Sequence, residues 1–208
     1  MGIGFRNEIR PQQGLLRVRE FQMAEIEHFV DPGNKDHHKF DSIKDLKLPL
    51  LSADSQETNF EVITDMTIGE AVEKKMIGNQ TIAYFMGRTY LFLTSCGIRP
   101  ESIRYRQHRS NEMAHYAQDC WDAEVETSYG WIEVAGHADR SCFDLTKHAE
   151  KTKTELVAAR PLKEPKTMKY VNITIDKPKI GKALKKDSKP VCAYLADLSE
   201  DDKKVLFE

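Results

Sequence analysis

The chain has 208 residues, of which 40% are hydrophobic and 31% are charged, and its formal net charge is -2. This length and balance favour a soluble, globular protein with one well-buried domain. The longest apolar stretch, residues 82–98, is interrupted by Gly87 and Arg88, which favours a buried amphipathic helix over a membrane span.

Two strand-like runs near the start of the chain predict an antiparallel hairpin. Apolar and polar residues alternate loosely over residues 3–9 and 15–21, and Pro11 and Gly14 bracket a short link. Residues on neighbouring strands can share a ligand, so Arg6 can hold a phosphate while Phe21 stacks on a purine. A solvated charged hairpin explains the same spacing equally well, because Arg and Glu are common on exposed strands.

Residues 30–55, which contain Pro32, Gly33, Pro49 and many charges, predict an irregular loop with an exposed His37 and His38. Thr67 and Glu70 form a capping-box pattern that predicts a helix to about residue 77. A longer helix is expected from about residue 82, where apolar residues recur at steps of three and four.

Strands are expected over residues 102–106, 114–126 and 130–136. Together with the helices they predict an α+β fold, in which an antiparallel β-sheet is flanked by helices. The four cysteines are scattered without metal-ligand spacing, so no zinc site is predicted.

Three segments carry a resemblance to a known family. Residues 5–25 contain RNE, a turn and then RxxxFxxxE, which resembles motif two of the class II aminoacyl-tRNA synthetases. Residues 110–124 read SNEMAHYAQDCWDAE and residues 131–148 read WIEVAGHADRSCFDLTKH. In this order they resemble segments of the eukaryotic-type glycyl-tRNA synthetases, so the chain is expected to be part of a class II catalytic domain.

The resemblance implies a glycine–tRNA ligase, which activates glycine with ATP and Mg²⁺ and transfers it to tRNA(Gly). It implies that Arg6 is a catalytic residue that grips the α-phosphate, and that Phe21 stacks on adenine. The residues that match ATP-binding positions are Arg6, Asn7, Glu8, Arg17, Val18, Phe21, Glu133 and Val134.

Three further residues are assigned through the same resemblance. Glu133 is expected to help hold Mg²⁺, although a strand Glu that faces water is the simpler interpretation of that residue alone. Glu25 is expected to bind the glycine ammonium group and Arg140 its carboxylate. Asp139 either orients Arg140 or begins a helix.

The family's motif one, motif three and anticodon-binding domain are not found, so the chain is expected to be a piece with little activity by itself. Residues 1–146 are expected to form the partial catalytic core. Residues 147–208 are expected to form a basic insertion, since residues 147–196 contain thirteen Lys or Arg and five Asp or Glu. This insertion either faces tRNA or is a solvated linker.

The resemblance also implies a homodimer in the complete enzyme. The charged N-terminal residues lack the apolar region of a secretory signal, so a cytoplasmic protein without a membrane anchor is expected, with a mitochondrial pool as an addition. The alternative function is that of a truncated, noncatalytic fragment that binds tRNA or another protein.

Overall fold

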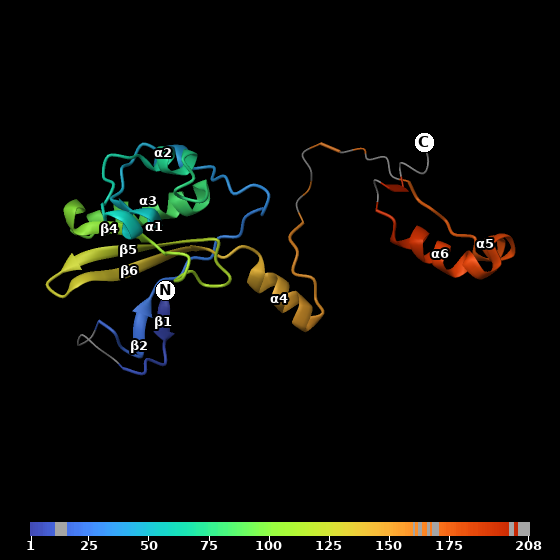
Figure 1. Cartoon of the computed structure of the whole chain (residues 1–208). Helices are drawn as coiled ribbons and strands as arrows, with labels where there is room; N and C mark the ends of the chain where they lie inside the picture. The colour runs from blue at the N-terminus through green and yellow to red at the C-terminus, as the bar shows by residue number, and fades with distance from the viewer. Residues whose placement is uncertain are drawn as a thin grey trace. The chain divides into compact units, whose positions relative to one another are not determined.

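The computed structural model describes residues 1–10, 16–159, 161, 164–165, 167, 171–199 and 202–203. The chain divides into two compact units, Met1–Leu156 and Val157–Glu208 (Figure 1). The expected hairpin link at Pro11 and Gly14 lies outside the described residues. None of the helices that the structure describes is long and apolar enough to cross a membrane.

A four-stranded sheet in the order β3, β4, β5, β6 forms the centre of the first unit. Its strands are β3 (Leu50–Leu51), β4 (Ile103–Gln107), β5 (Asp119–Thr127) and β6 (Gly130–Asp139). β4, β5 and β6 pair antiparallel, whereas β3 runs parallel to β4. The prediction of an antiparallel sheet holds for β4, β5 and β6 but is wrong for β3. The helical segment between β3 and β4 is a crossover connection, which makes these two strands parallel.

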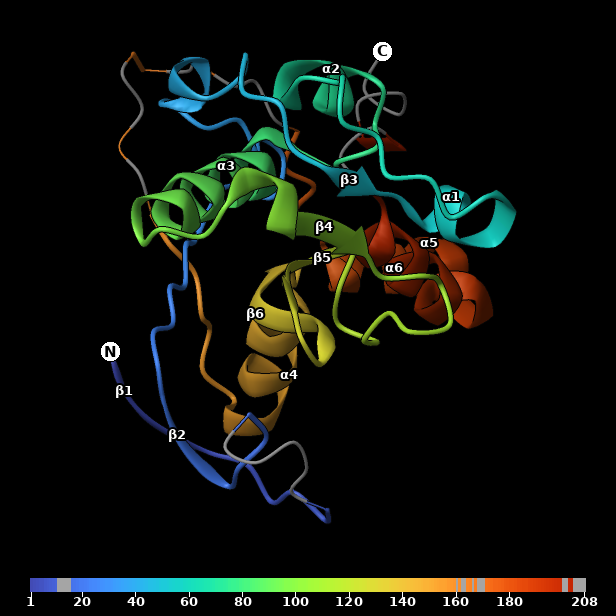
Figure 2. The same cartoon turned by 90° about the vertical axis from the view of Figure 1, so that its left-hand side faces the viewer.

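The helices of the first unit flank this sheet, which makes the fold α+β as predicted. They are α1 (Ala53–Thr58), α2 (Ile68–Glu73), α3 (Gln80–Ser95) and α4 (Phe143–Thr152), with short 3₁₀ turns η1 (Phe40–Ser42) and η2 (Pro100–Ser102). α2 and α3 lie on the same side of the sheet (Figure 2). β1 and β2 lie on its other side (Figure 1).

Local capping explains where α2 and α3 begin. Thr67 accepts a hydrogen bond from the Glu70 backbone, and the Glu70 side chain accepts one from the Thr67 backbone, so the predicted capping box is confirmed. α2 ends at Glu73, earlier than predicted, because Lys75 takes a left-handed φ of 57°. Asn79 caps α3 through the backbone N–H of Ile82.

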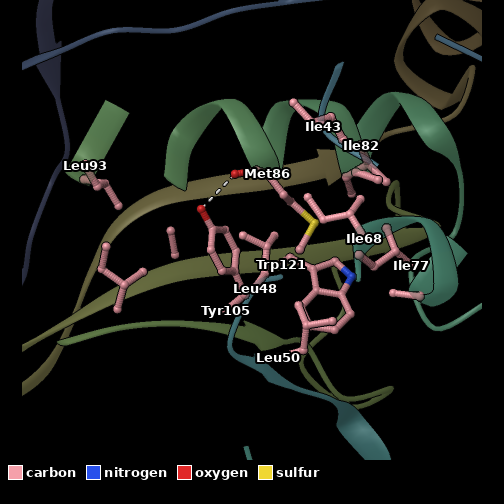
Figure 3. Close-up of a cluster of buried hydrophobic side chains, with 14 of the residues drawn as sticks. Ile43, Leu48, Leu50, Ile68, Ile77, Ile82, Met86, Leu93, Tyr105 and Trp121 are labelled. Atoms are coloured by element: carbon pink, nitrogen blue, oxygen red, sulfur yellow. Dashed lines mark hydrogen bonds between the residues drawn. The ribbon is translucent and has the colours of Figure 1, made fainter. Parts of the chain in front are cut away.

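The main core lies between the sheet and α3 (Figure 3). Its largest fully buried side chains are Trp121, Tyr105, Leu48, Leu50, Ile68, Ile77, Met86 and Ile103. Each such apolar side chain contributes roughly 1.5–3 kcal/mol when it leaves water. The Tyr105 hydroxyl is also satisfied, since it donates to the Met86 carbonyl at 2.9 Å.

The predicted hairpin is present, but its strands are shorter than expected: β1 is Gly2–Phe5 and β2 is Glu20–Met23. Gly4 lies opposite Phe21, and the pairing continues to a bond from the Arg6 backbone N–H to the Arg19 carbonyl at 2.9 Å. A Cβ atom on Gly4 would stand 3.0 Å from the Phe21 ring and 2.7 Å from the Met23 sulfur. Glycine therefore makes room at this position for both side chains.

The chain from β2 to β3 is largely irregular, as predicted, but it does not leave His37 exposed. His37 is only 7% exposed, and its ring stacks on Tyr84 of α3 with centroids 3.8 Å apart. Its Nδ1 accepts the Lys39 backbone N–H at 3.2 Å. The prediction of an exposed His37 is wrong, because the aromatic residues of α3 provide a surface that a local sequence pattern does not reveal.

The second unit contains α5 (Lys177–Leu184), the 3₁₀ turn η3 (Lys185–Asp187) and α6 (Ser188–Asp197). The boundary between the two compact units follows Leu156. The expected division into a partial catalytic core, residues 1–146, and a basic insertion, residues 147–208, stays a prediction. Cys96, Cys120, Cys142 and Cys192 are free thiols.

Candidate functional site

One face of the sheet is apolar and the opposite face is charged. Along β4 and β5, the core residues Tyr105 and Trp121 alternate with charged residues that point to the other side. Residue pairing places Arg104 opposite Glu124, Arg106 opposite Asp122, and Glu133 of β6 opposite Glu124. We call the surface formed by Arg104, Arg106, Asp122, Glu124 and Glu133 the charged face.

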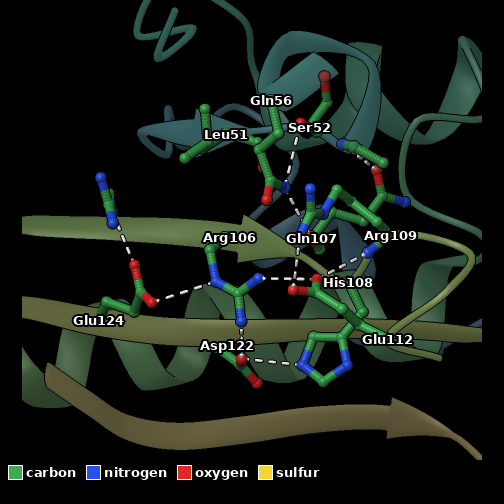
Figure 4. Close-up of polar contacts among 12 residues, drawn as sticks. Leu51, Ser52, Gln56, Arg106, Gln107, His108, Arg109, Glu112, Asp122 and Glu124 are labelled. Carbon is green, nitrogen blue, oxygen red and sulfur yellow. Dashed lines mark hydrogen bonds and ion pairs between the residues drawn. The ribbon is translucent and has the colours of Figure 1, made fainter. Parts of the chain in front are cut away.

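Arg106 is the centre of the ion pairs on the charged face (Figure 4). Its Nε lies 3.2 Å from Glu124 Oε1, and its Nη2 lies 3.1 Å from Asp122 Oδ2. Its Nη1 lies 3.0 Å from Oε2 of Glu112, in the loop after β4. Hydrogen bonds from Arg109, together with Arg106, lower the pKa of Glu112 to about 2. This carboxylate is therefore ionised at neutral pH and its pairs persist.

The two buried carboxylates that β5 contributes to the charged face, Asp122 and Glu124, each have a second cationic or imidazole partner. Glu124 Oε2 lies 2.7 Å from Arg104 Nε, and the Arg104 guanidinium stacks on the Trp131 ring at 4.2 Å. Asp122 Oδ2 lies 2.8 Å from His108 Nε2. The side chains of Asp122 and Glu124 are 8% and 10% exposed, so these contacts hold them in fixed orientations.

Glu133 is the charged-face residue that the sequence singled out, and its surroundings perturb it. Burial, followed by the charge of Asp122, raises the pKa of Glu133, while Arg6 is the strongest of the cations that oppose this shift. A Cβ atom on Gly136 would stand 3.7 Å from Glu133 Oε1 and 3.8 Å from Asp122 Oδ1. One oxygen of each carboxylate therefore lies within 4 Å of the space that a Cβ of Gly136 would fill.

A β-bulge sets the direction of Glu133. The pairing of β5 with β6 shifts between Ala123 and Glu124, so that Glu133 lies opposite Glu124 while Ala135 lies opposite Ala123. Val134 is the extra residue, and it is 48% exposed.

The hairpin brings Arg6 and Phe21 to the same side of its two strands. Since Gly4 is opposite Phe21 and the Arg6 backbone bonds to Arg19, Arg6 and Phe21 are diagonal neighbours. Phe21 lines a hollow of about 270 Å³ together with Ile3, Glu20 and Gln22, but neither Arg6 nor Glu133 lines it. A second hollow of about 440 Å³ is lined by Met1, Gly2, Ile3, Gln22, Met23 and Ala24.

The other predicted ATP-binding residues surround the hairpin. The Glu8 backbone N–H bonds to the Arg6 carbonyl, and the Glu8 carbonyl accepts from Arg19 Nε at 2.9 Å. Asn7 and Arg17 are exposed, and Val18 is half-buried. Of the ATP-binding set, the hairpin therefore groups six residues, and β6 supplies Glu133 and Val134.

The two residues predicted to bind glycine lie in different surroundings. Glu25 follows β2, is exposed, and makes no hydrogen bond or ion pair within the part of the chain that the structure describes. Arg140 follows β6 and pairs with Asp144 of α4 at 2.6 Å. Asp139 does not contact Arg140, because its carboxylate accepts from Lys35 at 2.7 Å and from Asn79 at 2.8 Å.

Arg106, Asp122 and His108 are part of the site but are absent from the sequence prediction. Their signal is the alternation of charged with apolar residues in β4 and β5, which predicts a charged sheet face but not which charges pair. Among the described residues, no three His, Cys, Asp or Glu side chains lie close enough together to bind one metal ion. Glu133 and Asp122 can supply two oxygen ligands, which suits Mg²⁺ that retains water and phosphate ligands.

Comparison with known proteins shows which proteins the chain is similar to in sequence. The chain is 50% identical over 202 residues to the mitochondrial glycine–tRNA ligase 1 of Saccharomyces cerevisiae, and 47% identical over 208 residues to the glycine–tRNA ligase of Methanocaldococcus jannaschii. The whole chain is similar to one segment of the glycine–tRNA ligases. These matches cover 97% and 98% of this chain, but only 29% and 36% of the two ligases.

A plant relative, the putative cytoplasmic glycine–tRNA ligase of Arabidopsis thaliana, is 49% identical over 195 residues, which is 94% of this chain and 42% of the relative. The similar ligases thus include proteins named as mitochondrial and as cytoplasmic. No protein-family model matches the chain. The resemblance expected from the sequence is confirmed, and the chain spans less than half the length of each of these ligases.

Proposed function

We propose that the chain is the ATP- and glycine-binding segment of a class II synthetase catalytic domain, and that it forms glycyl-adenylate as part of a complete cytoplasmic glycine–tRNA ligase. One observation carries this proposal: the chain matches the glycine–tRNA ligases over almost its whole length. In addition, Arg6 of the hairpin lies near enough to Glu133 of β6 for its positive charge to oppose the rise in the pKa of that carboxyl. The two segments are distant in the sequence, and both match ATP-binding positions through the family resemblance. Their proximity supports one shared nucleotide site between the hairpin and the charged face.

In this site Arg6 grips the α-phosphate while the glycine carboxylate attacks it. The reaction brings two anions together, and a guanidinium already in place offsets their repulsion and the charge that moves to pyrophosphate. Phe21, diagonal to Arg6, stacks on adenine. The other hairpin contacts to ATP come from Asn7, Glu8, Arg17 and Val18, and Val134 contributes from the bulge of β6.

Glu133 and Asp122 hold Mg²⁺, which when bound neutralises charge on the phosphate oxygens of ATP. The approach of their two oxygens above Gly136 supports this assignment. The ion pair of Asp122 with Arg106 and its hydrogen bond with His108 keep its carboxylate in place, so little reorganisation accompanies binding.

Glycine is tethered at both ends in the proposed site. Glu25, which has no partner among the described residues, binds the ammonium group, and Arg140 binds the carboxylate. Attraction alone cannot exclude alanine, because one methyl group changes binding by only ~1–3 kcal/mol. Selection therefore requires a rigid cavity that has no room for the methyl group.

The tRNA(Gly) approaches the basic second unit. The exposed lysines of α5, η3 and the start of α6 are Lys177, Lys179, Lys182, Lys185, Lys186 and Lys189, and a phosphate backbone is attracted by such a group. This observation also favours a second candidate function, that of a noncatalytic tRNA-binding fragment. Homodimerisation is proposed for the complete enzyme only.

The decisive test is ATP–pyrophosphate exchange with each amino acid, first on this chain and then on a full-length ligase that carries this segment. We expect glycine-dependent exchange in the full-length protein and weak exchange in the chain alone. Arg6→Ala should reduce exchange by about 10²-fold or more, the size found when a preorganised donor to a transition state is removed. Arg10→Ala is the matched control, since Arg10 is also exposed on the hairpin but has no assigned role.

Two results would contradict the proposal. Unchanged exchange in Arg6→Ala would remove Arg6 from the phosphate role. Exchange that depends on another amino acid would exclude glycine as the substrate. If the full-length protein shows no exchange but the chain binds tRNA with strong salt dependence, the noncatalytic function is favoured instead.

A further inference from the structure

The two long segments that carry the family resemblance meet at Arg140. The first contributes His115 and Tyr116, from the loop before β5, and the second contributes the turn between β6 and α4. The His115 ring packs edge-on against Phe143, with centroids 5.0 Å apart. The Arg140 guanidinium lies over the Tyr116 ring, 4.7 Å from its centroid. The loop therefore forms an aromatic platform under Arg140.

A second contact fixes the rotation of the guanidinium in its plane. Arg140 Nη2 lies 2.6 Å from Asp144 Oδ2, and Asp144 belongs to the first turn of α4. The Tyr116 ring covers one face of the planar Arg140 guanidinium, and the Asp144 carboxylate contacts one of its N–H edges. Because a guanidinium carries five N–H groups, others stay available for a second carboxylate.

The backbone around Arg140 is anchored on both sides. The Asp139 carboxylate accepts from Lys35 and Asn79, and its Oδ1 also accepts the Ser141 backbone N–H at 3.1 Å. The Asp139 carbonyl accepts the Gln118 backbone N–H at 2.7 Å, which ties the turn to the loop that contains the platform. Ser141 takes a left-handed φ of 54°, a conformation that these contacts hold in place.

We propose that Tyr116 is a positioning residue that fixes the plane of the Arg140 guanidinium, with Asp144 fixing its rotation, so that a free N–H edge is directed to the carboxylate of glycine. This inference rests on the proposed function, which assigns Arg140 to glycine. Half of the Arg140 side chain is exposed, and without these supports it would lose more conformational freedom on binding. The platform thus gives the 110–124 segment a physical role beside Arg140.

The test uses nuclear magnetic resonance on the full 208-residue chain, with the Arg140 Nε–H signal assigned through Arg140→Lys. Glycine is titrated against the wild-type chain and against Tyr116→Leu, Tyr116→Phe and Asp144→Asn. Glycinamide, which lacks the carboxylate, is the ligand control. Tyr129→Leu is the variant control, since Tyr129 is 69% exposed and its ring contacts no cation within the described residues.

We expect glycine, but not glycinamide, to shift the Arg140 signal. Tyr116→Leu should weaken glycine binding by about two- to five-fold, as expected for the loss of a cation–π contact, and should broaden the Arg140 signal. Tyr116→Phe keeps the aromatic face and should bind as the wild-type chain does, as should Tyr129→Leu. Asp144→Asn should weaken binding to a similar extent.

The outcomes separate this inference from the proposed function. If glycine shifts Arg140 in the wild-type chain and Tyr116→Leu binds glycine equally well, the positioning role of Tyr116 is refuted while the assignment of Arg140 stands. If glycine leaves the Arg140 signal unchanged in the wild-type chain, the assignment of Arg140 fails and the inference fails with it. Should Tyr116→Leu not fold, Asp144→Asn carries the test, and unchanged or tighter glycine binding in that variant would overturn the inference.

Discussion

Replacing Glu124 with Gln removes the charge that holds two arginines on the charged face. Glu124 is 10% exposed, and its two oxygens lie 2.7 Å from Arg104 Nε and 3.2 Å from Arg106 Nε. Glutamine keeps the shape but leaves both guanidinium groups, 13% and 22% exposed, without this countercharge. Breaking a buried pair commonly costs ~3–5 kcal/mol, and the residual exposure of the arginines places the expected loss near ~3 kcal/mol.

This loss should lower the melting temperature of the first unit by roughly 6–12 °C, given about 2–4 °C per kcal/mol for a domain of this size. Urea unfolding followed by circular dichroism measures the change in free energy directly. Glu126→Gln is the matched control, because Glu126 lies two residues further along β5 and is exposed, and it should change stability by less than ~0.5 kcal/mol. Equal stability of the Glu124 and Glu126 variants would show that the ion pairs of the charged face do not stabilise the fold.

Three further changes test individual contacts. Tyr105→Phe removes the bond to the Met86 carbonyl and should cost ~1 kcal/mol in urea unfolding, with no loss indicating that water already satisfies the hydroxyl. Thr67→Ala removes the side-chain half of a capping box and should cost ~1 kcal/mol by the same measurement, whereas an unchanged midpoint would mean that α2 does not depend on its cap. Burial lowers the pKa of both His37 and His137 in the folded chain, so the unfolded state takes up protons first as the pH falls below the ordinary value of 6.5. Stability should therefore be fully present above pH 6.5 and fall towards pH 5, and a stability that stays level over this range would contradict the burial of both rings.

The elements that sequence predicted well are those whose causes are local. The capping box at Thr67 and the three- and four-residue spacing of α3 involve neighbours in the sequence, and both are confirmed. The short strand Leu50–Leu51 was not predicted. Its partner Tyr105 is more than 50 residues away along the chain, and the two strands meet only when the helices between them are folded onto the sheet. The burial of His37 was missed for the same reason, since Tyr84 is distant in the sequence.

In the candidate site, too, some residues could be identified from the sequence and others depend on contacts between distant segments. Sequence motifs identified Arg6, Phe21 and Glu133 through resemblance, and their roles stay predictions. The supporting residues Asp122 and Arg106 could not be identified in this way, because their importance comes from pairing across strands. A strand pattern predicts which side chains share a face, but not which of them form ion pairs.

The extra residue at Val134 allows Glu133 to lie on the charged face although Ala135 faces the core. In an unbroken strand of the same sequence, Glu133 would face the same way as Ala135 and His137, towards the helical layer. Deletion of Val134 would place Glu133 next to Ala135, and simple alternation would then keep the carboxylate opposite Glu124 and Ala135 in the core. A related protein that is one residue shorter at this point can therefore keep the same carboxylate position with a regular strand.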